Sequence, residues 1–153
     1  MKMHENLNKL IPGLQKWNNG AGIDPASWIN CYARYDMAMG YAMLFWPDFV
    51  LYEDCVFIQQ PDPQSYASWM KSCNGDKTQV EGTINHRHIT DMFLNSEVQP
   101  TKEMVIHIGR LLKDMWSCRL KRDFPERNIQ IEFFEDDSDN LVDYQITIFQ
   151  ERG

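Results

Sequence analysis

The sequence lacks the short motifs by which many enzymes can be identified. It contains neither of the glycine-rich nucleotide-binding patterns GxGxxG and GxxxxGK[ST], and it has no GxSxG, HExxH or CxxC. These absences remove support for the commonest nucleotide, hydrolase and zinc chemistries. They do not exclude an enzyme, because small α+β folds often carry catalytic groups on separate elements.

Cysteine is sparse and scattered along the chain. Cys31, Cys55, Cys73 and Cys118 lie too far apart for paired metal ligation and are too few for a disulfide scaffold, so reduced and buried thiols are expected. The N-terminus lacks the apolar stretch of an export signal. The least polar segment, residues 37–46, ends at Pro47, short of the ~20 apolar residues that span a bilayer. We therefore expect a cytoplasmic protein without a membrane segment.

Positive charge is in short supply. Fifteen lysines and arginines face 22 aspartates and glutamates, a formal net charge of −7. A field of this sign repels phosphate backbones, so nucleic acid is not expected as a partner. The 153 residues, 43% of them hydrophobic, predict one globular domain over residues 1–153. A chain of this size buries enough surface to fold without disulfides or structural metal, and no cofactor is indicated.

The N-terminal part predicts helices. Asp24 before Pro25 is a typical helix start, and seven apolar or aromatic residues follow at helical spacing until Pro47. These residues are Trp28, Tyr32, Tyr35, Met39, Ala42, Met43 and Trp46. They predict one helix, and its second half, apolar all round, predicts a central and enclosed position.

Further along, β-forming residues on both sides of Glu53-Asp54 predict a tight hairpin, with a single bent strand as the alternative. Asp62-Pro63 predicts a short helix that ends at Asn74-Gly75, and Pro100-Thr101 begins a clear amphipathic helix. After Pro125 apolar residues alternate along two segments, which predicts a C-terminal β-hairpin. The fold class is therefore α+β, with four or five helices packed on a small antiparallel sheet. Phe134 and Phe149 lie on the polar faces of the two strands, so a helix or another subunit should partly cover this side.

Residues 78–94 admit two interpretations. As a helix, the segment aligns Val80, Ile84 and Met92 on one face, and its length together with the possible caps Asp76 and Thr78 favours this interpretation. As a strand, it places His86 and His88 on the same side. The choice between them decides where the polar residues of the segment point.

The helical interpretation turns Glu81, Asn85 and His88 toward the core. Buried polar groups must hydrogen-bond one another, a neighbouring helix or a ligand, and a buried glutamate beside a histidine suits proton transfer. Glu81 and His88 are thus candidate catalytic residues, and Asn85 is a candidate ligand-binding residue. The alternative is a structural polar network that fixes the packing. The candidate ligand-binding residues on the preceding helical segment are Trp28, Tyr32, Tyr35 and Asp36.

Two weaker patterns concern cations. His86 and His88 could share a metal only on a strand and lack an identifiable third ligand, so no metal site is predicted. The acidic loop Glu135–Asn140 lacks the ligand spacing and glycine of an EF-hand, and is interpreted as a solvated turn that a basic partner could contact.

Two function classes remain. The first is an acidic interaction protein that binds a basic protein partner and could form homodimers. The second is a small-molecule binder or acid/base enzyme, with Glu81, Asn85 and His88 facing an aromatic pocket.

Overall fold

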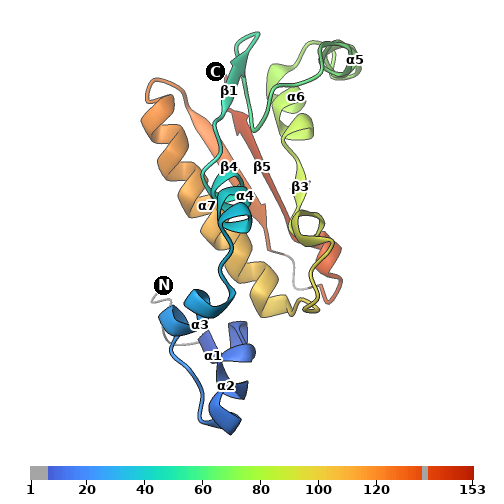
Figure 1. Ribbon diagram of the computed structural model, residues 1–153. Coiled ribbons are helices and arrows are strands. Elements are labelled where there is room, and N and C mark those ends of the chain that lie inside the picture. Colours follow the sequence, from blue (N-terminus) through green and yellow to red (C-terminus); the bar gives the residue numbers. More distant parts are fainter. Residues whose placement is uncertain (1–6, 136–137) are drawn as a thin grey trace. The chain divides into compact units, whose positions relative to one another are not determined.

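The computed structural model describes residues 7–135 and 138–153 (Figure 1). The helices and strands, with η for a 3-10 helix, are α1 Leu7–Leu10, α2 Gly13–Lys16, η2 Asn18–Gly20, α3 Pro25–Tyr32, α4 Tyr35–Phe45, β1 Val50–Tyr52, β2 Cys55–Phe57, α5 Pro63–Ser72, α6 Lys77–Ile84, β3 Arg87–His88, η3 Thr90–Phe93, α7 Lys102–Asp123, β4 Ile129–Phe134, η4 Leu141–Asp143 and β5 Gln145–Gln150. The α+β class and the C-terminal strand pair are confirmed.

The chain divides into two compact units, Met1–Ala42 and Met43–Gly153, each of which is described by itself. The boundary falls within α4. The expectation of a single domain over residues 1–153 stays a prediction.

The first unit holds short helices. Asp24 begins α3 as expected, because its carboxylate accepts a hydrogen bond from the Ser27 amide at 3.0 Å. The prediction of one continuous helix from here to Pro47 is wrong. Ala33 adopts an extended backbone with ψ of 137° and separates α3 from α4. The expected enclosure of the second half is also wrong, since α4 has no buried residue.

The second unit contains two antiparallel sheets. Strands β1 and β2 form the predicted hairpin, with Glu53 and Asp54 at its turn. The other sheet has the strand order β3-β5-β4 (Figure 1). In it, Ile131 of β4 pairs with Ile148 of β5.

Helices lie on both faces of this three-stranded sheet. Helix α7 packs against β4 so closely that a Cβ atom at Gly109 would lie 2.1 Å from the Phe133 ring, which only glycine avoids. On the other face, α6 packs beside β5, where the Thr147 hydroxyl donates to the Gly82 carbonyl at 2.7 Å. A helix of the chain itself therefore covers this second face beside Phe149, where a Cβ atom at Gly82 would lie 4.0 Å from the ring, whereas Phe134 is 45% exposed.

The segment 78–94 differs from the favoured prediction. Helix α6 ends at Ile84 with Asn85 as its C-cap, and the chain then continues as the short strand β3 and the 3-10 helix η3. His88 is therefore on a strand and pairs with Gln145 of β5. The helical prediction is correct only up to Ile84. Beyond it, the Asn85 side chain bonds to β2 and β5, and the backbone of Arg87 and His88 pairs with β5, which is distant in sequence.

Candidate functional site

Glu81 lies on α6 with no exposed surface. Its Oε1 accepts hydrogen bonds from the Val56 amide at 2.7 Å and the Gln150 side-chain amide at 2.5 Å. Its Oε2 accepts from the Gln150 backbone amide and from Arg152 Nη1, both at 2.8 Å. Both carboxylate oxygens are thus engaged by donors, one of which is cationic, and this pattern suits an ionised carboxylate.

Asn85 is equally buried and follows one turn later. Its Oδ1 accepts from the Ile58 amide at 2.9 Å. Its Nδ2 donates to the carbonyls of Val56 at 2.8 Å and Ile148 at 3.2 Å. The Asn85 side chain therefore bonds to Val56 of β2, to Ile58 just after β2, and to Ile148 of β5.

These two side chains join strands that belong to different sheets. Strand β3 pairs only with the first two residues of β5, Gln145 and Ile146. Further along this edge, the Ile148 carbonyl bonds to Asn85 and the Gln150 amide bonds to Glu81, in place of the backbone partners that a longer strand would supply. Buried backbone groups need such partners. With no surface open to a substrate, the pair matches the structural alternative, a satisfied polar network that fixes packing.

An ionic network that no sequence pattern indicated surrounds Glu81. The Asp54 carboxylate accepts a hydrogen bond from Arg127 Nη1 at 2.8 Å, and the Asp54 backbone carbonyl accepts one from Arg152 Nη2 at 2.9 Å. The Arg127 hydrogen bond lowers the pKa of Asp54 below its usual range. These partners are 71 to 98 residues apart in sequence. No local pattern could reveal them.

His88 does not join Glu81 and Asn85. Its Nδ1 lies 2.7 Å from the Val142 carbonyl, and its ring centroid lies 5.0 Å from that of His86. The two imidazoles thus approach each other, as the strand alternative implied. Burial, with His88 and Arg87 nearby, lowers the pKa of His86. Among the described residues, no group of three or more histidine, cysteine, aspartate or glutamate side chains is placed to hold a metal ion.

The aromatic candidates belong to the first unit. Trp28 and Tyr32 lie on α3 with ring centroids 5.1 Å apart. Tyr35 is 96% exposed, and Asp36 pairs with Arg34 at 2.5 Å. Trp28 thus packs on Tyr32, and Asp36 pairs with Arg34, within the first unit. The donors that bond to Glu81 all lie in the second unit.

The cysteines are free, but the expectation that all are buried is wrong, since Cys31 and Cys118 are exposed. Cys55 is buried, and its pKa is raised by burial and by the charge of Glu81. Burial also raises the pKa of the neighbouring Tyr66 to about 12. A thiol with a raised pKa is a weak nucleophile. No described helix has the length and apolar character required to cross a membrane.

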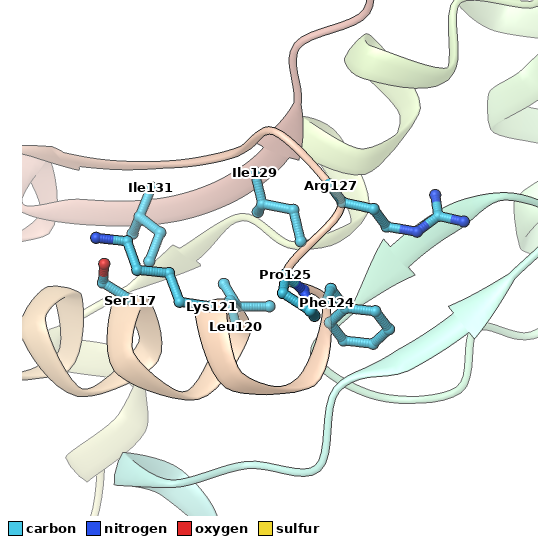
Figure 2. A pocket seen from close by; sticks show the side chains of 8 residues that line it. All are labelled: Ser117, Leu120, Lys121, Phe124, Pro125, Arg127, Ile129 and Ile131. Atoms are coloured by element: carbon cyan, nitrogen blue, oxygen red, sulfur yellow. The ribbon is translucent and has the colours of Figure 1, made fainter.

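Two clefts of about 140 Å³ each lie in the second unit. One is at the end of α7, between Leu120, Phe124 and Ile129 (Figure 2). Figure 2 shows that Arg127, at its edge, extends its guanidinium away from the other lining side chains. The second, which we call the η3 cleft, is lined by Ile89, Thr90, Phe93, Ser96, Val98, Pro100, Met104, Val105 and Ile108. Neither cleft is lined by Glu81, Asn85 or His88.

Negative charge is concentrated at one end of the second unit, which we call the acidic end and define as residues 89–110 and 132–145. The Arg110–Glu135 ion pair at 2.6 Å and the hydrogen bond from the Ile89 amide to the Tyr144 carbonyl at 3.0 Å hold these segments together. In sequence they contain nine carboxylates and two basic side chains, a difference equal to the −7 of the whole chain. Two of the nine carboxylates, Asp136 and Asp137, lie outside the described residues. They belong to the predicted acidic loop Glu135–Asn140, so the structure does not describe that part of the predicted loop.

Comparison of the chain with models of known protein families, with curated proteins and with solved structures gave no match.

Proposed function

We propose that the protein is an acidic cytoplasmic binding protein that recognises a basic region of another protein through its acidic end. The observation that carries this proposal is the distribution of charge. Outside the acidic end the chain holds equal numbers of acidic and basic side chains, so its net charge comes from one region. A concentrated field of one sign steers and orients a partner of the opposite sign.

Contacts among the described residues support this proposal. Among its described residues, Arg110 pairs with Glu135 and Lys102 pairs with Asp139 at 3.9 Å, and these pairs account for the two basic side chains of the acidic end. Both basic side chains of the acidic end are therefore already paired within the chain, and the carboxylates of this region outnumber them. Asp91, Glu97 and Glu132 are exposed there.

The alternative, a small-molecule binder or acid/base enzyme centred on Glu81, Asn85 and His88, has less support. Glu81 and Asn85 have no exposed surface, and His88 lies on another element. A general acid or base must come within hydrogen-bond reach of its substrate. This alternative would require α6 to separate from β5, with loss of the hydrogen bonds described above.

The proposal can be tested with a fluorescein-labelled decalysine peptide, whose binding is followed by fluorescence anisotropy. We expect binding at low ionic strength that weakens as salt rises, because surface charges are screened. The double variant Glu132→Gln/Asp139→Asn should bind about fivefold more weakly, which corresponds to ~1 kcal/mol.

The matched control is Asp114→Asn/Glu126→Gln, which makes the same change in net charge at exposed positions outside the acidic end. Its affinity for decalysine should stay within about twofold of the unmodified protein. If the two double variants lose the same affinity, the peptide responds to overall charge and the acidic end is not a binding surface.

A further inference from the structure

The η3 cleft is an apolar hollow within the acidic end. Of its nine lining residues, only Thr90 and Ser96 are polar. The Ser96 hydroxyl donates to the Val98 carbonyl at 2.9 Å and accepts from the Val98 amide at 3.2 Å, so its bonding capacity serves the loop itself. Among the described residues the Thr90 hydroxyl is buried without a hydrogen-bond partner, and the other seven lining residues are apolar, so most of the space is suited to an apolar group.

The floor of the cleft is part of the hydrophobic core. Ile89 is 1% exposed, Val105 is 2% exposed, and both pack in the same cluster as Trp116. The Thr101 side chain caps α7 by accepting from the Met104 amide at 3.3 Å, which fixes the first turn that forms one wall. In contrast, Val98 at the outer wall is 58% exposed. A preformed floor with an accessible edge lowers the ordering cost of binding.

Carboxylates alternate with the lining residues. Asp91 follows Thr90, Glu97 precedes Val98 and Glu103 precedes Met104. Residues 89–108 contain one lysine, Lys102, which faces Asp139. The surroundings of the cleft therefore disfavour an anionic occupant such as a fatty acid or a nucleotide and favour a cationic one.

We infer that the η3 cleft receives one apolar side chain of a partner protein, from a segment in which lysine or arginine flanks that side chain. This inference rests on the proposed function and specifies the partner's chemistry. A volume of about 140 Å³ is close to the ~150 Å³ of an engineered apolar cavity that binds benzene, so a phenylalanine or leucine side chain fits. The flanking cations would meet the carboxylates beside the cleft.

The test compares two peptides, Lys-Lys-Phe-Lys-Lys and Lys-Lys-Ala-Lys-Lys, each titrated into the full chain by isothermal calorimetry. Burial of a phenylalanine side chain should make the first peptide bind about tenfold more tightly than the second. In methyl NMR spectra, the phenylalanine peptide should shift the signals of Ile89, Val105 and Ile108, and the alanine peptide should leave them nearly unchanged.

A pair of matched variants checks the location. Val98→Lys places a cation at the mouth of the cleft, and Val142→Lys makes the same change at an exposed residue of the acidic end that does not line the cleft. We expect Val98→Lys to abolish the preference for phenylalanine and Val142→Lys to retain it. Circular dichroism and thermal unfolding establish that both variants remain folded, and retention of the preference by Val98→Lys would contradict the inference.

The remaining outcomes separate the two proposals. If both peptides bind equally, and Glu132→Gln/Asp139→Asn weakens both, the acidic end is a binding surface but the cleft is not an anchor site. If neither these peptides nor decalysine binds, the proposed function fails as well. If benzylamine alone produces the methyl shifts at the same concentration as the phenylalanine peptide, the cleft is a site for a small amine and the inferred protein segment is wrong.

Discussion

The two ends of strand β5 use charge in opposite ways. At the end of β5, Glu81 and Asp54 are matched by Arg127 and Arg152 in a network that lies partly inside the fold. At its start, seven carboxylates of the described residues are accompanied by two basic side chains, Lys102 and Arg110. The paired charges around Glu81 hold strands together, whereas the excess carboxylates of the acidic end are available to attract a cationic partner. Removing a charge should therefore affect stability at one end and binding at the other.

The largest effect is expected at Glu81. Glu81→Gln removes the negative charge that pairs with Arg152 and places an amide among four donors, so we expect the free energy of unfolding to fall by about 3 kcal/mol or more. Urea unfolding followed by circular dichroism measures this change. The control Glu97→Gln, at an exposed position outside this network, should stay within about 0.5 kcal/mol of the unmodified protein. Equal losses in the two variants would mean that the Glu81 network contributes no stability.

Asn85→Ala should give the next largest effect. It leaves the Ile58 amide and the carbonyls of Val56 and Ile148 without this partner, and we expect a loss of about 2–3 kcal/mol. The same unfolding measurement applies, with the exposed Asn95→Ala as its control. A loss below about 0.5 kcal/mol would contradict the proposed link between β2 and β5.

His86 should produce a smaller, pH-dependent effect. Its pKa is lowered in the folded protein, so the unfolded chain binds more protons and stability is lost as the pH falls through the ordinary histidine range near ~6.5. Between about pH 7.5 and pH 5.5 we expect His86→Gln to remove a decline of less than ~1 kcal/mol. Thermal unfolding at a series of pH values, with His107→Gln for comparison, measures it. An unchanged pH profile would contradict the assignment to His86.

The smallest effect on stability is expected from neutralisation at the acidic end. Glu132→Gln/Asp139→Asn should change the free energy of unfolding by no more than about 0.5 kcal/mol, because exposed charges contribute little. Its effect on decalysine binding should be larger than its effect on unfolding. A strong destabilisation would show that these carboxylates serve the fold, and the contrast between the two ends would disappear.

Sequence reasoning succeeded where the determinants were local. Asp24, Asp62 and Thr101 accept hydrogen bonds from the backbone amide three residues further along, so their role as helix starts is encoded within one turn. The hairpin turn at Glu53-Asp54 and the alternation in β4 and β5 are local in the same sense.

It failed where distant contacts overrode a continuing pattern. Apolar spacing runs through Ala33 and through Asn85, yet the helices end there. Asn85 bonds to residues 27 to 63 positions away, and His88 pairs with β5. The burial of Glu81 was predicted from its helical face, but its cationic partner Arg152 lies 71 residues further along. Periodicity carries no information on such pairs.

The turn of the first hairpin has a consequence for the order of folding. Glu53 and Asp54 both adopt left-handed backbone conformations, with φ of 50° and 66°, without the glycine that usually makes this conformation accessible. The Asp54 carbonyl accepts hydrogen bonds from the side chains of Gln150 and Arg152. Because these stabilising donors come from the last residues of the chain, the hairpin should become stable only after β5 has docked. Substitutions in β1 would then change the unfolding rate more than the folding rate.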